Sequence, residues 1–459
     1  MKTKKYFGLA LCLAIFTAIF SCSEFTEVDM PQSQLTGAAV FEDITTANAA
    51  LADIYSRMRE GGVVAGVQNG GTILMAGYSD DLEFYGENVD IEQFNKHTMM
   101  PSNTMLSGLW NTTYGQIYAI NAFIEGIESS SVITGADRDR LLGEAIFLRA
   151  YFNFYLVNLF GDMPYVTITD YAVNAVISKT SEAEVWNNIK SDLLLAQTLV
   201  PEDYPTTDRV RPNKATVTAL LARIYLYTAE YELAEQQATL VIDNPLYIWE
   251  TDPGLIFLKE SPSTIWSIHP GAAGLNTKDA RAYIFSAGPP FKPALSANLM
   301  NSFETGDVRK TLWTRAITDG TDTWHHAYKY KKLINTGTSQ EYTILFRLAE
   351  QYLIRAEART MSGDLTGAQQ DLNMVRNRAG LPNTMADTQS SLLAAILHER
   401  RVEFFAEQSH RWFDLKRTGT ASSVLSVVKP GWQETDTHLP IPESELLLNE
   451  NLLPQNPGY

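Results

Sequence analysis

Three adjacent side chains, Trp324, His325 and His326, combine the two kinds of group that a sugar-binding site needs. The apolar face of a sugar ring stacks on an aromatic side chain, and its hydroxyl groups require hydrogen-bonding partners around that platform. The surrounding sequence, TDGTDTWHHAYKYKK, is polar and contains turn-forming residues, which is typical of a loop. We therefore predict that this segment binds a glycan, with local packing as the alternative.

A second group of candidate ligand contacts lies in the segment GYSDDLEFYGEN, which supplies Tyr78, Asp80, Asp81 and Tyr85. These residues again place aromatic rings beside hydrogen-bonding carboxylates. Tyr283, in the run DARAYIF, is a further aromatic candidate. The two aspartates have an alternative role as calcium ligands, since that ion prefers oxygen, although the spacing of an EF-hand is absent.

The sequence lacks the motifs of the common enzyme classes. It has no HExxH pair, no G-x-S-x-G elbow, no phosphate-binding loop and no dinucleotide fingerprint. A glycosidase needs only two well-placed carboxylates, so a chain with 53 acidic residues leaves that alternative open. We predict a non-catalytic binding protein with no cofactor and no metal.

The N-terminus has the pattern of an export signal that ends in a lipid-attachment site. Lysines at positions 2, 4 and 5 precede the apolar stretch 6–20, which is too short to span a bilayer. The stretch ends in Ile19-Phe20-Ser21-Cys22, which resembles a bacterial lipobox. We predict that residues 1–21 are removed, that Cys22 is acylated, and that the acyl chains hold the protein on a membrane. Cys12 leaves with the leader, which excludes a disulfide.

Charge and hydropathy limit the classes of partner that the chain can bind. The full chain has a net charge of -17, which repels phosphate backbones, and no stripe of lysine and arginine offsets it, which argues against nucleic-acid binding. The most apolar stretch after the leader, 145–160, contains Arg149, Asn153 and Asn158, which argues against a membrane span. Residues 22–40 are polar and irregular, and we predict that they form a spacer before a single domain at 41–459.

Helical periodicity dominates that domain and predicts a mostly α fold. The expected helices cover 45–59, 106–127, 137–160, 181–199, 214–228, 231–242, 342–361, 365–379 and 392–415. Seven charged residues lie among apolar neighbours in these helices, and we expect them to form structural ion pairs because charges are seldom buried unpaired. They are Glu144, Arg149, Arg400, Arg401, Glu403, Arg411 and Asp414.

Two helix pairs have the small-residue spacing of tetratricopeptide units. Ala222 and Ala234 lie twelve residues apart, as do Ala356 and Ala368, and small side chains at such positions let two helices approach closely. The pairs are separated by a block at 246–340 that is rich in Gly, Pro and aromatic residues, with a strand-like run at 264–269. A similar block covers 61–103. We expect ligand contacts in these two blocks, because loops on a rigid scaffold often contain the binding residues.

Four segments resemble the SusD/RagB family of outer-membrane nutrient-binding lipoproteins. They are LGEAIFLRAYFNFYLVNLFGDMPYV (142–166), YTILFRLAEQYLIRAEA (342–358), ILHERRVEFFAEQSHRWFDLKRTG (396–419) and HLPIPESELLLNENLLPQNPGY (438–459). They occur in the family's order and follow the lipobox. One departure is Gln408-Ser409-His410, where the family often has a glycine after the acidic residue, and we expect it to affect a turn.

The resemblance implies a degenerate tetratricopeptide-type scaffold with a loop-rich upper layer of small strands. It also implies a partner, a TonB-dependent outer-membrane barrel of the SusC type, and an oligosaccharide ligand, with peptides bound by some members. We therefore predict a lipid-anchored protein on the outer membrane, facing the cell exterior, that captures oligosaccharides and passes them to the barrel. A peptide-binding RagB-like receptor and a tetratricopeptide scaffold for proteins are the alternatives.

Overall fold

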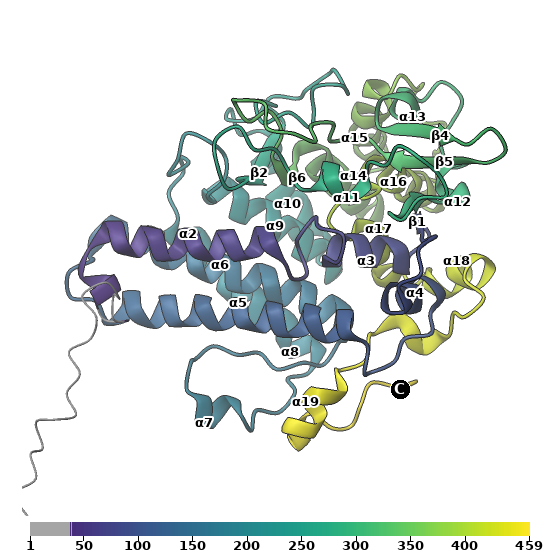
Figure 1. Cartoon of the computed structure of the whole chain (residues 1–459). Coiled ribbons are helices and arrows are strands. Elements are labelled where there is room, and N and C mark those ends of the chain that lie inside the picture. The colour runs from purple at the N-terminus through teal and green to yellow at the C-terminus, as the bar shows by residue number, and fades with distance from the viewer. Residues whose placement is uncertain (1–36, 38) are drawn as a thin grey trace, which may run out of the picture.

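The computed structural model describes Gly37 and residues 39–459, and it confirms a mostly helical chain (Figure 1). Helices hold 53% of the residues and strands 6%. The predicted leader and Cys22 lie outside the described residues, as does most of the expected spacer. The first described element, η2 (Ala39–Glu42), begins within the last residues of that spacer. None of the described helices combines the length and hydropathy needed to cross a bilayer.

One side of the molecule is a layer of long helices around α6 (Gly135–Phe160). Every residue of α6 from Leu141 to Phe160 is buried, because neighbouring helices cover it on several sides. The apolar stretch 145–160 in the sequence therefore belongs to a helix of the core. The covering helices are α2 (Ile44–Glu60), α5 (Thr104–Ser129) and α8 (Glu182–Leu199).

The two tetratricopeptide-type pairs stack directly on each other. They are α9 (Lys214–Tyr227) with α10 (Tyr231–Ile242), and α14 (Leu348–Ser362) with α15 (Leu365–Arg378), and α10 packs against α14. The four predicted alanines are fully buried at 0% exposure, which confirms the close approach of the helices. Helix α16 (Gln389–Phe404) packs against α14 and α15, and is followed by α17 (His410–Arg417) and α18 (Ala421–Val428).

A thinner layer of loops, short helices and strands covers one end of this scaffold (Figure 1). Its main sheet has the antiparallel order β1-β3-β5-β4, and β2 pairs with β6 in a second sheet. The strands are β1 (Leu82–Glu83), β2 (Thr264–Ile268), β3 (Ala294–Leu295), β4 (Thr314–Thr318), β5 (Thr323–Ala327) and β6 (Thr343–Arg347). Its short helices are α11 (Asp279–Tyr283), α12 (Ala297–Met300) and α13 (Val308–Leu312).

Three sequence expectations about elements are corrected. The run 342–361 begins with strand β6, which pairs with β2, and only the residues from Leu348 onward are helical. The run 392–415 is interrupted between α16 and α17, where Gln408 and Ser409 have positive φ angles of 44° and 62°. The block 61–103 contains two short helices, α3 (Gly71–Tyr78) and α4 (Val89–Lys96), which we expected to be loops.

The seven charged residues expected in ion pairs all have charged partners. Glu144 contacts Arg140 at 3.0 Å, and Arg149 contacts Asp192 at 2.8 Å. Arg400 lies 2.8 Å from Asp414, and Glu403 lies 2.8 Å from Arg309. Arg401 and Arg411 both contact Asp80, at 2.8 and 2.6 Å. These contacts confirm that the charges in the helical motifs have a structural role.

Candidate functional site

The main sheet brings Tyr85 beside Trp324, although the two residues are far apart in the sequence. Leu82 of β1 pairs with Leu295 of β3, and Leu295 also pairs with His325 of β5. Tyr85 lies two residues after the end of β1, and its ring reaches Trp324 of β5, the strand beyond β3. The two ring centroids are 6.4 Å apart, with the planes at 84° in an edge-to-face arrangement. The structure thus joins one candidate from each of the two predicted binding blocks.

Tyr85 is the exposed aromatic side chain of this pair. It is 45% exposed, and its hydroxyl donates a hydrogen bond to the Glu83 carboxylate at 2.5 Å. Partial burial and the neighbouring Glu83 both raise the pKa of the Tyr85 hydroxyl, which keeps it protonated at neutral pH. The site therefore presents an aromatic face beside a hydrogen-bond acceptor, which are the two groups that a sugar ring requires.

Trp324 is largely packed, with only 9% of its surface exposed. It forms a small apolar cluster with Phe285 and Ala294. Gly288 lies so close that a Cβ atom there would be 2.1 Å from the indole Cε3 and Cζ3 atoms. The structure therefore favours the packing alternative for most of the indole, and only an edge is left beside Tyr85.

The two histidines differ in their surroundings, as expected for successive residues of a strand. His326 is 1% exposed, its ring centroid lies 5.0 Å from that of Phe285, and its Nδ1 is 3.0 Å from the Ala327 carbonyl oxygen. His325 is half-buried. Burial lowers the pKa of both imidazoles, so they are neutral near pH 7. His325 is accessible to a ligand, and His326 is placed for packing.

Tyr78 and Tyr283, two of the expected ligand contacts, are buried and do not reach the surface. Tyr78 is 0% exposed, donates a hydrogen bond to the Asp436 carbonyl at 2.8 Å, and packs its ring against Trp412. Tyr283 is 4% exposed and lies 3.4 Å from the Ala406 carbonyl. These contacts correct the expectation, because each phenol already has its partner inside the protein.

The expectation that Asp80 and Asp81 contact a ligand is also corrected. Asp80 receives a bidentate hydrogen bond from Arg411 at 2.6 and 3.0 Å, while Asp81 lies 3.5 Å from Arg401. Burial opposes ionisation of both, but the hydrogen bond from Arg411 holds the pKa of Asp80 below its ordinary value. Burial raises the pKa of Asp81 to about 6. The two carboxylates therefore face guanidinium groups, which disfavours calcium between them.

Two features near the rim were missed in the sequence. Phe291 is 85% exposed on the loop that also contains Gly288, and its only signal is an aromatic residue within the run GPPFKP. A cavity of about 360 Å³ also lies beside β1, lined by Asp80, Glu83, Asn95 and Lys429 among others. Burial lowers the pKa of the Lys429 ammonium to about 8. The residues that line this cavity come from segments more than 300 residues apart, so no local sequence pattern predicts the cavity.

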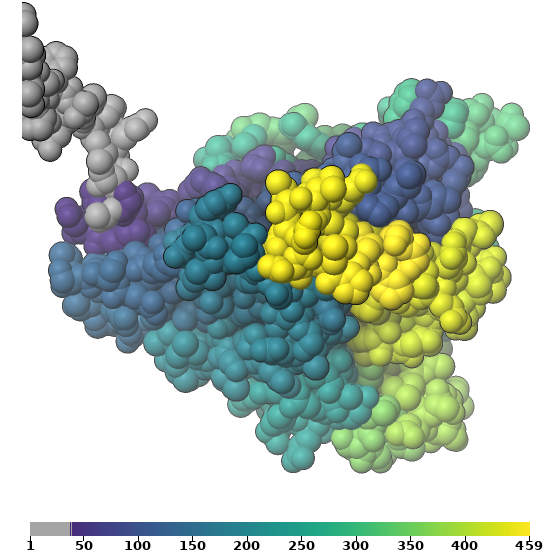
Figure 2. All heavy atoms as spheres, turned by 90° about the horizontal axis from the view of Figure 1, so that it is seen from below, coloured from purple at the N-terminus to yellow at the C-terminus, as the bar shows by residue number. Residues whose placement is uncertain are grey.

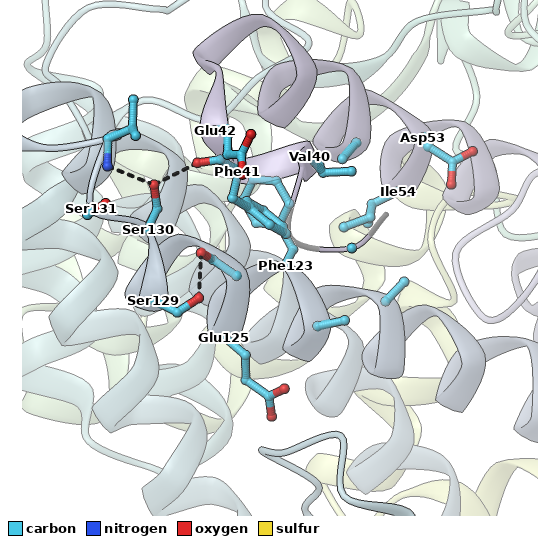
Figure 3. A pocket seen from close by; sticks show the side chains of 16 residues that line it. Val40, Phe41, Glu42, Asp53, Ile54, Phe123, Glu125, Ser129, Ser130 and Ser131 are labelled. Atoms are coloured by element: carbon cyan, nitrogen blue, oxygen red, sulfur yellow. Dashed lines mark hydrogen bonds between the residues drawn. The ribbon is translucent and has the colours of Figure 1, made fainter. Parts of the chain in front are cut away.

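A further hollow is lined by none of these residues. It has a volume of about 840 Å³ and lies between η2, α2 and the C-terminal part of α5 (Figure 3). Its walls are mainly apolar, with Phe41 packed on Phe123 at a centroid distance of 5.5 Å, and Ser130 donating to the Phe41 carbonyl at 2.7 Å. We place the functional site at Tyr85, because volume alone supplies no ligand chemistry. Within the described part of the chain, no three His, Cys, Asp or Glu side chains gather as metal ligands.

A helical scaffold that supports an aromatic and carboxylate rim on a layer of loops defines a ligand-binding protein. Two family profiles match the chain, one described as the SusD family over residues 274–459, the other as starch-binding associating with outer membrane over 27–226. The chain belongs to the SusD/RagB family of SusD-like proteins. The family is associated with the outer membrane and consists of non-catalytic glycan-binding proteins, so the chain is not an enzyme.

Individual proteins are similar to the chain in sequence or in fold. SusD-like protein P2 from Formosa agariphila is 27% identical over 451 residues, which cover 84% of this chain and 87% of that protein. A SusD superfamily protein from Bacteroides vulgatus has a similar fold, with a TM-score of 0.80 at 21% identity over 91% of this chain and 100% of that one. Surface glycan-binding protein A from Bacteroides thetaiotaomicron, in complex with laminarihexaose, gives 0.76 at 20% identity over 90% and 99%.

Proposed function

We propose that this chain is a cell-surface lipoprotein that captures an oligosaccharide at the rim formed by Tyr85, Glu83 and the edge of Trp324, without covalent chemistry. The observation that carries the proposal is the half-exposed ring of Tyr85, held beside a carboxylate that accepts hydrogen bonds. The likeness in fold to a protein solved with laminarihexaose supports the choice of ligand class. His325 follows Trp324 on β5 and is half-buried, and its imidazole is a further candidate contact for the ligand.

The contact energy sets a modest affinity. Ordering a flexible glycan offsets much of the stacking energy, which gives a Kd of about a micromolar to a millimolar. Removal of the Tyr85 ring should weaken binding by about 1.4 kcal/mol, or roughly tenfold, which is within the range for a single aromatic contact. Trp324→Ala is expected to weaken binding as well, but it also empties the cluster with Phe285.

Isothermal titration calorimetry against laminarihexaose, other soluble oligosaccharides and a set of peptides tests the proposal. We expect heat with at least one oligosaccharide, a roughly tenfold loss in Tyr85→Ala, and near-normal affinity in Tyr85→Phe, which keeps the ring. Binding to peptides alone would transfer the chain to the peptide-binding class. An unchanged affinity in Tyr85→Ala would remove this rim from the ligand site.

The proposal includes an anchor and a partner. Residues 1–21 act as a lipoprotein leader, Cys22 receives the lipid, and residues 22–40 link it to the domain at 41–459. The partner is a TonB-dependent, SusC-like barrel in the outer membrane, which receives the oligosaccharide. Mass spectrometry of the mature protein should find acylated Cys22, and Cys22→Ser should release the protein from membranes. Co-purification from detergent-solubilised outer membranes should recover the barrel, and its absence there would contradict the transport role.

A further inference from the structure

A second cleft lies on the opposite side of the scaffold from the strand layer. It has a volume of about 410 Å³ and is bounded by α5, by α7 (Tyr171–Asn174) and by α19 (Glu443–Leu448) near the C-terminus. Figure 1 places α7 and α19 below α5, away from β4 and β5, and Figure 2 shows this face with the C-terminal segment in yellow. Asn449 and Asn451 donate hydrogen bonds to the carbonyls of Ile177 and Val176, which fixes the C-terminal segment against the segment after α7.

One wall of this cleft is a row of aromatic side chains on a single helix. Trp110, Tyr114 and Tyr118 follow at intervals of four residues on α5, so they lie on one face at steps of about 6 Å. Trp110 is buried, with its ring centroid 4.7 Å from that of Tyr114, while Tyr118 is 54% exposed. Tyr171, on α7, also lines the cleft and is 84% exposed. Two exposed tyrosine rings therefore flank a packed aromatic floor.

Polar groups also line the cleft. Asn111 lies on α5, and Asn174 lies on α7, with its Nδ2 bound to the Ile168 carbonyl at 2.8 Å. The Oδ1 of Asn174 has no hydrogen-bond partner among the described residues. Glu445, on α19, is the one charged side chain among the described residues that line the cleft. The lining thus offers amide groups, phenols and one carboxylate, with no cation to attract an acidic ligand.

We propose that this cleft is a second saccharide-binding site, specific for an uncharged glycan. Stacking surfaces with neighbouring amide and hydroxyl groups suit a sugar ring. The row on α5 spans about 12 Å, which suits a short oligosaccharide rather than one ring. A protein partner is the competing occupant, because Leu448 lines the cleft and is exposed. The concave shape favours the sugar, since the volume lies within the range of small-ligand sites, about 300–1,000 Å³.

The inference rests on the proposed function only for the class of ligand, a glycan. A comparison of four variants tests the second site separately from the site at Tyr85. Full-length mature protein is titrated with laminarihexaose and maltohexaose as uncharged probes, and with oligogalacturonate as an anionic probe. The variants are Tyr118→Ala with Tyr171→Ala, the matched pair Tyr118→Phe with Tyr171→Phe, Tyr85→Ala, and Ile248→Ala as an exposed control. The substituted tyrosines are exposed, so the variants are expected to fold, and circular dichroism checks this.

We expect two classes of site for an uncharged probe. In the double alanine variant, the affinity of one class should fall at least tenfold. The double phenylalanine variant should retain that class, and Tyr85→Ala should reduce the other. Loss of all glycan binding in Tyr85→Ala, with unchanged binding in the double alanine variant, would overturn the second site and leave the first. Binding of oligogalacturonate at the tyrosine pair would overturn the specificity for uncharged glycans. Absence of binding by both uncharged probes would overturn both sites. Loss of barrel association in the double alanine variant, with every glycan affinity unchanged, would make the cleft a protein-docking surface.

Discussion

Replacement of Asp80 by asparagine distinguishes a structural carboxylate from a ligand contact. Asp80 accepts two hydrogen bonds from Arg411 and lies 2.8 Å from a guanidinium nitrogen of Arg401, while its own side chain is 1% exposed. Asp80→Asn removes the negative charge, which leaves Arg411 without its carboxylate partner and Arg401 with Asp81 alone, in a mostly buried position. Removal of one partner from a buried pair costs about 3–5 kcal/mol. Because the asparagine oxygen still accepts one hydrogen bond, we expect the lower value, about 3 kcal/mol.

Chemical denaturation followed by circular dichroism measures this loss, and Asp53→Asn provides a matched control. Asp53 pairs with Arg57 one turn away at 2.6 Å, but its side chain is 56% exposed, so the same change in charge should cost less than about 0.5 kcal/mol. For an ordered chain of about 420 residues, a loss of 3 kcal/mol lowers Tm by about 3 °C. A cost below about 1 kcal/mol for Asp80→Asn would refute the reasoning. Lost oligosaccharide affinity at unchanged stability would mean that Asp80 contacts the ligand.

Three further predictions concern single residues. The pKa of Asp81 is raised by burial to about 6, so its protonation stabilises the folded state at low pH, and this contribution is lost as pH rises through 6. The stability of Asp81→Asn relative to wild type should therefore increase between pH 4 and 7. A difference in unfolding free energy that stays constant over this range in urea titrations would contradict the prediction. Ser409 has a φ of 62° and a buried hydroxyl without a partner among the described residues, so Ser409→Gly should raise the free energy of unfolding by about 1 kcal/mol, whereas a loss in the same assay would refute strain at this turn. Gly288→Ala should displace the Trp324 ring and cost about 1–3 kcal/mol, with a change in tryptophan fluorescence and weaker glycan binding as the readouts; an unchanged spectrum would disprove the close packing.

Helix positions were predictable where the signal is local. The expected helix over 231–242 agrees with α10, and 214–228 differs from α9 by one residue. Strand β6 was missed because all five of its residues are buried, and a continuous apolar run does not separate a strand from a helix. The break before α17 was missed because Gln408 and Ser409, rather than glycines, adopt the left-handed conformation there. Gln408 and Ser409, noted as a departure from the family's glycine, lie at that turn.

The ligand rim was only partly predictable, for reasons that differ between residues. The polar, aromatic loops correctly drew attention to Tyr85 and Trp324, but their contact depends on the pairing of β1, β3 and β5, which no local pattern specifies. Asp80 has the same local surroundings as a surface aspartate. Its burial follows from Arg401 and Arg411, which were themselves expected in ion pairs but with unknown partners. Pairing between distant segments therefore decided which candidates stayed at the surface.

Buried charges also explain how the strand layer keeps a fixed position on the helices. Arg309 of α13 contacts Glu399 and Glu403 of α16, and Arg347 of β6 also contacts Glu403. Apolar packing tolerates small shifts, whereas a charge removed from water remains stable only with its partner in place. The layer is therefore fixed at residues that do not face the ligand. The rim itself rests on a small apolar cluster around Trp324. Substitutions at the rim can consequently change the ligand with little effect on the scaffold.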